Sequence, residues 1–213
     1  MPLSISATAG SVRSARQPDD AVKGEARAAL AAGNALMLID RIQGRGAMVA
    51  AARHVTVTTV NQMAIWARGI IGVTVTPDTA ARLGLHRIDR HRLEYDRAPV
   101  FLASVEAARG VTTGISAADR AATLQVIGDP ASRPADLACP GHIVPILVSR
   151  RDGPTLPERA CRQIDEFGFG DEAAFCDVLN DMGEVATLSQ CADLADRLGL
   201  PLVGSAPARE IHW

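Results

Sequence analysis

Short runs of apolar and β-branched residues alternate along this chain with stretches that carry a helical pattern. The apolar runs predict strands at residues 35–39, 48–52, 69–76, 100–107, 142–149, 173–179 and 200–203. Pro145 indicates that the strand at 142–149 lies at a sheet edge or bends. Alanine-rich or capped stretches predict helices at residues 21–32, 57–68, 77–85, 119–127, 156–167 and 188–198.

Strands and helices mix along the chain, and no linker divides two hydrophobic cores. This order predicts an α/β (α+β) fold with a single layered domain at residues 21–213, in which helices flank a mixed β-sheet. Residues 1–20 are small, polar and charged, which predicts a flexible N-terminal arm. The length of 213 residues suits one substantial domain.

The net charge and the length of the apolar runs argue against nucleic-acid binding and against membrane spanning. The net charge of −2 gives no basic field of the kind that nucleic-acid binding requires, and the His- and Arg-rich run at 86–97 is diluted by acids. No apolar run approaches the roughly 20 residues that span a bilayer, and residues 1–17 do not resemble a signal peptide. We therefore expect a cytoplasmic protein without membrane or nucleic-acid partners. The four cysteines form no Cys-x-x-Cys pair, so zinc and redox motifs have no support.

The stretch from Gly110 to Arg120 reads as a polar turn between a strand and a helix. Such a turn points backbone N–H groups at an anion, so its polar side chains are candidate ligands for an anion or a carbonyl group. The candidates are Thr112, Thr113, Ser116 and Asp119. The alternative is a turn whose polar groups satisfy one another.

The same stretch carries a family resemblance. Together with Pro130, the Asp136-Leu137 pair and Pro140-Gly141-His142, it resembles 3,4-dihydroxy-2-butanone 4-phosphate synthase, and the similarity extends from about residue 21 to 211. That family makes the four-carbon precursor of riboflavin from ribulose 5-phosphate. The resemblance implies its layered fold, and a homodimer whose pocket lies between the two subunits. It also implies magnesium held by an acidic loop and a later histidine.

The loops that would build this pocket depart from the family pattern. The first loop, residues 40–47, keeps one carboxylate, Asp40, and has Ile42 or Gln43 where the metal-binding glutamate is expected. Leu156 stands at the place of the metal-binding histidine, and Glu158 matches a family glutamate. From these departures we infer a fold that is kept and a site that is replaced or abandoned, with no metal or other cofactor.

Several candidates for chemistry remain. His142 suits proton transfer near neutral pH, or it forms a structural bond across the dimer. Asp177, which takes the place of the family's late-strand glutamate, is a candidate general base or a plain strand-end carboxylate. Arg41, with Arg45, would make the pocket mouth basic and suited to a carboxylate or phosphate, or both arginines are solvated. By its match to the family, Glu158 is a candidate substrate-binding residue.

Three functional hypotheses follow. The one we favour from the sequence is a repurposed, metal-independent cyclase, lyase or isomerase acting on a less charged small molecule, for example in specialised metabolism. The second is a genuine synthase with unusual ligands, in which Asp40, Glu158 and Asp177 hold magnesium. The third is a non-catalytic paralogue that binds a ligand or a synthase partner.

Overall fold

The strands form one mixed sheet. The structure is a computed structural model that describes residues 20–88, 99–148 and 155–204. Within these ranges the strands are β1 (Leu36–Asp40), β2 (Arg45–Ala51), β3 (Gly72–Val75), β4 (Val100–Phe101), β5 (Val105–Ala107), β6 (Leu137–Leu147), β7 (Ala173–Asp177) and β8 (Leu202–Gly204). They are ordered β4-β6-β3-β7-β2-β1-β8, and β5 pairs with β6. The pairs β1–β8 and β3–β6 are parallel and the other strand pairs antiparallel, which confirms the predicted mixed sheet.

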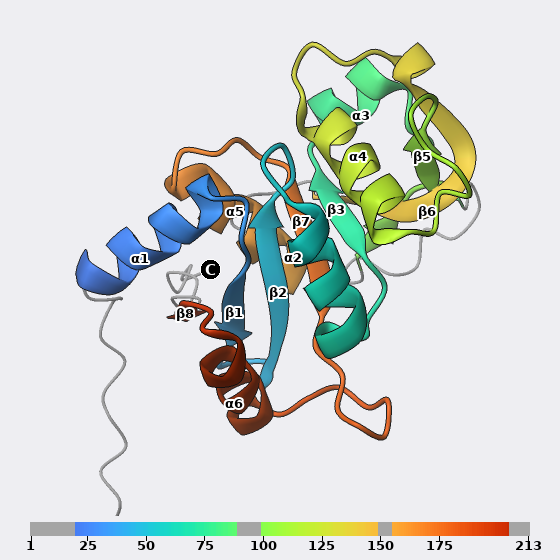
Figure 1. Cartoon of the computed structure of the whole chain (residues 1–213). Coiled ribbons are helices and arrows are strands. Elements are labelled where there is room, and N and C mark those ends of the chain that lie inside the picture. Colours follow the sequence, from blue (N-terminus) through green and yellow to red (C-terminus); the bar gives the residue numbers. More distant parts are fainter. Residues whose placement is uncertain (1–19, 89–98, 149–154, 205–213) are drawn as a thin grey trace, which may run out of the picture.

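Helices cover both faces of this sheet (Figure 1). They are α1 (Asp20–Ala31), α2 (Val57–Gln62), α3 (Pro77–Leu83), α4 (Ala117–Gly128), α5 (Leu156–Glu166) and α6 (Leu188–Leu198). Side chains of α1 and α5 pack with one strand face, the α5 face, whose buried members include Leu38, Val49 and Phe175. Side chains of α2, α4 and α6 pack with the opposite face, which includes Met48 and Cys176. The predicted layered α/β fold is therefore confirmed.

Local signals explain where α5 begins. Thr155 caps the helix and exchanges hydrogen bonds with Glu158 in a capping box, and a proline occupies the first turn, where its missing N–H costs nothing. Leu156, Ala160 and Ile164 then follow at helical spacing and are fully buried against the sheet. This docking places α5 beside the ends of β1 and β7.

Some predicted boundaries were wrong. The helix at 57–68 divides into α2 and a π-helical turn, Met63–Ala67, which ends at Arg68 in the left-handed conformation (φ 67°). The strand at 100–107 is two short strands, because β4 and β5 pair with different parts of β6. Strand β6 begins at Leu137, five residues before the predicted start at 142. Pro145 does not lie at an edge, because β6 runs between β3 and β4.

Two further predictions fall mostly on residues outside the described ranges. The arm at residues 1–20 lies outside the described residues except for Asp20, which begins α1. Most of the loop at 86–97 is likewise outside them.

Across the described ranges, no helix combines the length and apolar character that crossing a membrane requires. Three cysteines are buried and Cys139 is exposed, all as free thiols.

Candidate functional site

Four charged side chains meet on the α5 face, where the β1–β2 hairpin turns. Asp40 ends β1 directly opposite Arg45, the first residue of β2. Asp177 ends β7 opposite Ala47. Since side chains alternate along a strand, Asp40 and Asp177 point to the face that α5 covers, from which Arg159 approaches. We call Asp40, Arg45, Arg159 and Asp177 the charged quartet.

The pair formed by Asp40 and Arg159 is buried. Arg159 Nη1 donates to Asp40 Oδ1 at 3.1 Å, and the two side chains are 0% and 4% exposed. The same oxygen accepts the backbone N–H groups of Ile42 and Gln43, at 2.9 and 3.1 Å, which closes the hairpin turn. Asp40 Oδ2 is buried and makes no hydrogen bond within the described residues. The pair thus joins the hairpin to α5 and leaves one carboxylate oxygen available.

The second pair of the quartet lies nearer the surface. Arg45 Nη2 lies 3.0 Å from Asp177 Oδ1. Burial raises the pKa of Asp177, and the neighbouring Arg45 partly opposes that rise. Arg45 Nε is buried and makes no hydrogen bond within the described residues. The side chain as a whole is 27% exposed, so the guanidinium group can also pair with a bound anion.

A carboxylate–imidazole pair lies farther along the sheet. His142 Nδ1 on β6 is 3.4 Å from Glu106 Oε2 on β5. A Cβ atom at Gly114, whose φ is +76°, would overlap Glu106 Oε2 and lie 2.8 Å from His142 Nδ1. The carboxylate can orient the ring, which suits His142 to acid–base work.

The sheet places this pair on the same face as the quartet. Gly72 of β3 is level with Val144 on one side and Phe175 on the other. Phe175 and Ile146 belong to the α5 face, and Asp177 and His142 lie two and four residues from them along the same strands. Ile143 and Cys176 are buried against the opposite face, so His142 and Asp177 both point toward the α5 face.

The polar turn before α4 satisfies its own groups. Asp119 is buried and accepts hydrogen bonds from Thr112 N at 3.2 Å, Thr112 Oγ1 at 2.9 Å and Gly114 N at 3.1 Å. Ser116 Oγ caps α4 by accepting from Asp119 N at 3.0 Å. Thr113 is exposed. The Asp119 carboxylate occupies the place that an outside anion would take, so this geometry favours the self-satisfied turn.

The hydrogen bonds to Asp119 predict a pH dependence of stability. Burial alone would raise the pKa of this carboxyl group, but the hydrogen bonds from Thr112, Ser116 and Gly114 outweigh burial and lower it. A lowered pKa stabilises the fold above the pKa of the unfolded state, and this contribution is lost as pH falls through the folded value. We expect Asp119→Asn to destabilise the protein at pH 7 and much less near pH 3, in urea unfolding at both pH values. An equal loss at both would contradict this explanation.

The remaining sequence candidates occupy other places. Glu158 Oε2 accepts from Thr155 N at 3.1 Å and Thr155 Oγ1 at 2.7 Å, so its carboxylate is used by the helix cap. Arg41 is exposed on the hairpin turn and leans toward β8, where a Cβ at Gly204 would lie 3.7 Å from its Nε. The contact with Asp177 is made by Arg45 and not by Arg41.

Two residues of the site escaped sequence reasoning. Arg159 falls among the buried positions 156, 160 and 164 of α5, and a charged residue on the apolar stripe of a helix signals a buried partner. Glu106 lies on the short strand β5 opposite β6, and its pairing with His142 depends on a register shift that has no local signal.

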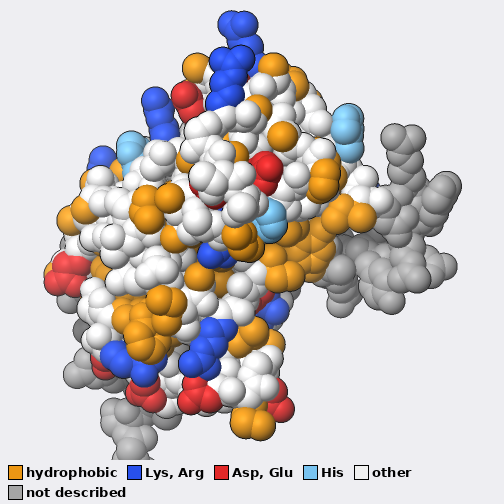
Figure 2. All heavy atoms as spheres, turned by 45° about the vertical axis from the view of Figure 1, so that its right-hand side comes forward, with side chains coloured by type: hydrophobic (Ala, Val, Ile, Leu, Met, Phe, Trp, Pro, Cys, Tyr) orange, Lys and Arg blue, Asp and Glu red, His pale blue; other side chains and the backbone are white. Residues whose placement is uncertain are grey.

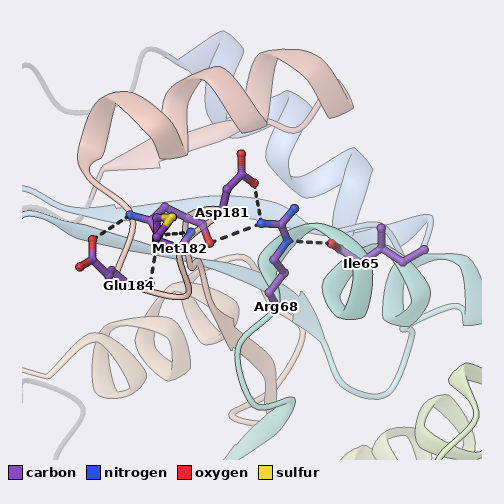
Figure 3. Close-up of polar contacts among 6 residues, drawn as sticks. Ile65, Arg68, Asp181, Met182 and Glu184 are labelled. Carbon is purple, nitrogen blue, oxygen red and sulfur yellow. Dashed lines mark hydrogen bonds and ion pairs between the residues drawn. The ribbon is translucent and has the colours of Figure 1, made fainter.

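The chain just after Asp177 is held by an arginine in an unusual conformation. Arg68 Nη1 donates to Asp181 Oδ1 at 2.6 Å and contacts the Asn180 carbonyl oxygen at 3.4 Å, as Figure 3 shows. Arg68 and Val178 form an isolated antiparallel bridge. Beside them lies a cavity of about 320 Å³ in which Arg197 stacks on Trp66 at 4.6 Å. These contacts fix the backbone that follows Asp177.

Comparison with known proteins identifies the scaffold. The family model for 3,4-dihydroxy-2-butanone 4-phosphate synthase matches residues 24–206. The chain belongs to the 3,4-dihydroxy-2-butanone 4-phosphate synthase family. Over 169 residues it is 34% identical to the synthase of Chromobacterium violaceum, a match that covers 76% of this chain and 79% of that protein.

Longer relatives match over part of their length. The riboflavin biosynthesis protein RibBA of Synechocystis is 34% identical over 190 residues, which cover 85% of this chain and 34% of that protein. The synthase of Pseudomonas aeruginosa is 34% identical over 166 residues, which cover 75% of this chain and 44% of that protein. The chain therefore spans less than half the length of these two relatives.

Solved structures agree on the fold. The two-domain synthase RibBX of A. baumannii superposes with a TM-score of 0.76 at 28% identity, covering 85% of this chain and 55% of that one. A synthase in complex with two magnesium ions superposes with a TM-score of 0.78 at 22% identity, covering 85% of this chain and 91% of that one.

The site residues of this chain do not fit a magnesium ion. Magnesium prefers several hard oxygen ligands in near-octahedral geometry. Asp40 is held by Arg159, Asp177 by Arg45, and Glu158 by the cap of α5. Among the described residues, no three His, Cys, Asp or Glu side chains are grouped so that they could share a metal ion. The earlier idea of a metal held by these three carboxylates therefore finds no geometric support.

Proposed function

We propose that this chain catalyses the reaction for which its family is named, the lyase-type formation of 3,4-dihydroxy-2-butanone 4-phosphate for riboflavin biosynthesis. The matches to synthases and RibBA proteins along most of the chain support this proposal. They favour it over the repurposed enzyme of specialised metabolism that we expected from the sequence. The observation that carries it is the placement of Glu106–His142 and the charged quartet on one sheet face.

In this proposal the chain's own residues supply proton transfer and charge. His142, oriented by Glu106, takes and returns protons at the carbon atoms next to the substrate carbonyl, as enolisation requires. Asp177, whose pKa burial raises, holds a proton closer to neutral pH than an ordinary aspartate and serves as a second acid–base group. The partly exposed guanidinium group of Arg45 pairs with the substrate phosphate.

A second copy of the chain completes the proposal. Ile70, Phe101 and Ile115 are exposed by 72%, 46% and 54%. Ile115 directly follows Gly114, where an added Cβ would lie 2.8 Å from His142 Nδ1. Hydrophobic side chains also form a broad area on the face shown in Figure 2. Exposed apolar residues beside a reactive histidine favour a homodimer whose small-molecule pocket lies near the subunit contact.

One observation favours a second candidate function. Two carboxylates that would face a metal are paired with arginines, and a third caps a helix. A site of this kind carries little net charge and suits a metal-independent lyase, cyclase or isomerase acting on a less charged small molecule. Its acid–base groups would again be His142 and Asp177.

Turnover of ribulose 5-phosphate separates the two candidates. The purified protein, tested for dimer formation by light scattering, is incubated with the sugar phosphate with and without Mg²⁺, and formate and the four-carbon phosphate are followed by NMR. We expect turnover, with kcat reduced about 10²–10⁴-fold in His142→Gln. His86→Gln is the matched control, because His86 is exposed and lies outside the site.

Two other results would contradict parts of this proposal. A folded dimer without turnover would reject the synthase and leave the metal-independent candidate, which a screen of neutral ketones and lactones would then test. Turnover that His142→Gln leaves unchanged would remove His142 from the mechanism.

A further inference from the structure

A second cavity lies at the opposite end of β2 from the charged quartet. Its volume is about 320 Å³. The length of β2 separates it from Arg45 by about 20 Å. Figure 1 shows the loop after β2 between helices α1 and α5 on one side and α3 and α4 on the other. The lining side chains that carry the argument below are Arg53, His54, Thr79, Arg82, Phe169 and Glu172.

Cationic groups dominate this cavity. Arg53 and His54 are exposed, and Arg53 makes no hydrogen bond or ion pair within the described residues. Arg82 Nη1 donates to the backbone oxygens of Asp129 and Ser132, at 3.1 and 2.9 Å, which holds its guanidinium at the wall. The one lining carboxylate, Glu172, already accepts a hydrogen bond from Thr79 Oγ1 at 2.6 Å. Two guanidinium groups thus face one carboxylate, which already accepts a hydrogen bond from Thr79.

An aromatic surface borders the cationic groups. The rings of Phe169 and His54 meet edge to face, with centroids 5.6 Å apart and planes at 79°. Gly168 and Gly170 flank Phe169 with φ values of +85° and +88°, which other residues rarely adopt, and they carry no side chain over the ring. The ring is partly buried and packs against the core of the α5 face. A Cβ at Gly168 would lie 4.0 Å from Arg27 Nη2, so a third guanidinium lies near the rim.

We propose that this cavity binds a phosphate monoester that carries a planar ring. Guanidinium groups recognise phosphate through paired N–H donors, and Phe169 with His54 offers a ring face and edge for stacking. This site is separate from the charged quartet and does not depend on the proposed reaction. Arg53 is its main anion ligand, because its side chain is accessible and forms no hydrogen bond or ion pair within the described residues.

Binding of phenyl phosphate tests the proposal with a probe that combines both chemical features. Isothermal titration of the full chain would be compared with inorganic phosphate, which lacks the ring, and benzyl alcohol, which lacks the charge. We expect saturable binding of phenyl phosphate, tighter than that of either partial probe. Arg53→Ala should weaken it about tenfold or more, the loss of one charge-assisted contact.

Two further variants identify the site. Arg109→Ala, an exposed arginine near neither cavity, should bind within about twofold of the unaltered protein, since such surface substitutions change little. Arg45→Met, which alters the charged quartet, should also retain binding. No saturable binding, or a loss in Arg45→Met in place of Arg53→Ala, would overturn the proposal whatever the turnover assay shows.

Discussion

Replacing Arg159 with methionine is expected to lower the free energy of unfolding by about 3–5 kcal/mol. The substitution keeps much of the side-chain volume but removes the guanidinium group that pairs with Asp40, whose side chain is 0% exposed. The buried carboxylate would then keep the hydrogen bonds from two backbone N–H groups but lose its cationic partner. Urea unfolding at pH 7 measures the effect.

Arg162→Met provides the matched control on the same helix. Arg162 pairs with Glu166 at 3.6 Å in an exposed i, i+4 contact, and such pairs contribute no more than about 0.5 kcal/mol. A double variant, Asp40→Asn with Arg159→Met, should recover part of the loss, because the buried charge is then absent. Similar losses in Arg159→Met and Arg162→Met would contradict the importance of the buried pair.

Gly114→Ala is expected to destabilise the protein by more than the ordinary cost of a left-handed alanine. That ordinary cost is about 1–2 kcal/mol. The new Cβ would also overlap the Glu106 carboxylate and press on His142, so we expect a total of about 3 kcal/mol or more. The same change should separate Glu106 from His142 and lower any activity that depends on the pair.

Gly110→Ala isolates the steric part of this effect. Gly110 has a φ of +74°, close to that of Gly114, but a Cβ there would meet nothing within 4 Å. The difference between the two variants in denaturant unfolding therefore measures the contact with Glu106 and His142. If Gly110→Ala costs as much as Gly114→Ala, the glycine at 114 serves backbone conformation alone.

The three charged pairs of the site differ in how accessible they are to a substrate. The Arg159–Asp40 pair is fully enclosed and joins the hairpin to α5. The Arg45–Asp177 pair is partly exposed, with 27% of the Arg45 side chain and 37% of the Asp177 side chain accessible. The Glu106–His142 pair is also partly exposed, at 24% for Glu106 and 43% for His142. The enclosed pair therefore supports the scaffold, and the two accessible pairs are the ones able to meet a substrate.

The elements with strong local signals were predicted well. The helix at 188–198 agrees with α6, which Thr187 and Gln190 begin through a capping box and Gly199 ends in the left-handed conformation. The single layered domain and the family also followed from the sequence, because caps, apolar periodicity and the Gly110–Arg120 stretch are local features. The break at Gln62 and the division of the strand at 100–107 did not, because they result from packing and pairing with distant segments.

The amino-acid sequence by itself determined the order of the elements, the mixed sheet and the family to which the chain belongs. It also marked His142 and Asp177 as candidates for proton transfer. Only the tertiary structure decided their partners. Asp40 meets Arg159, 119 positions away, and Asp177 meets Arg45. The physical reason is that strand order and register determine which side chains share a face, and neither is recorded in the local pattern of residues.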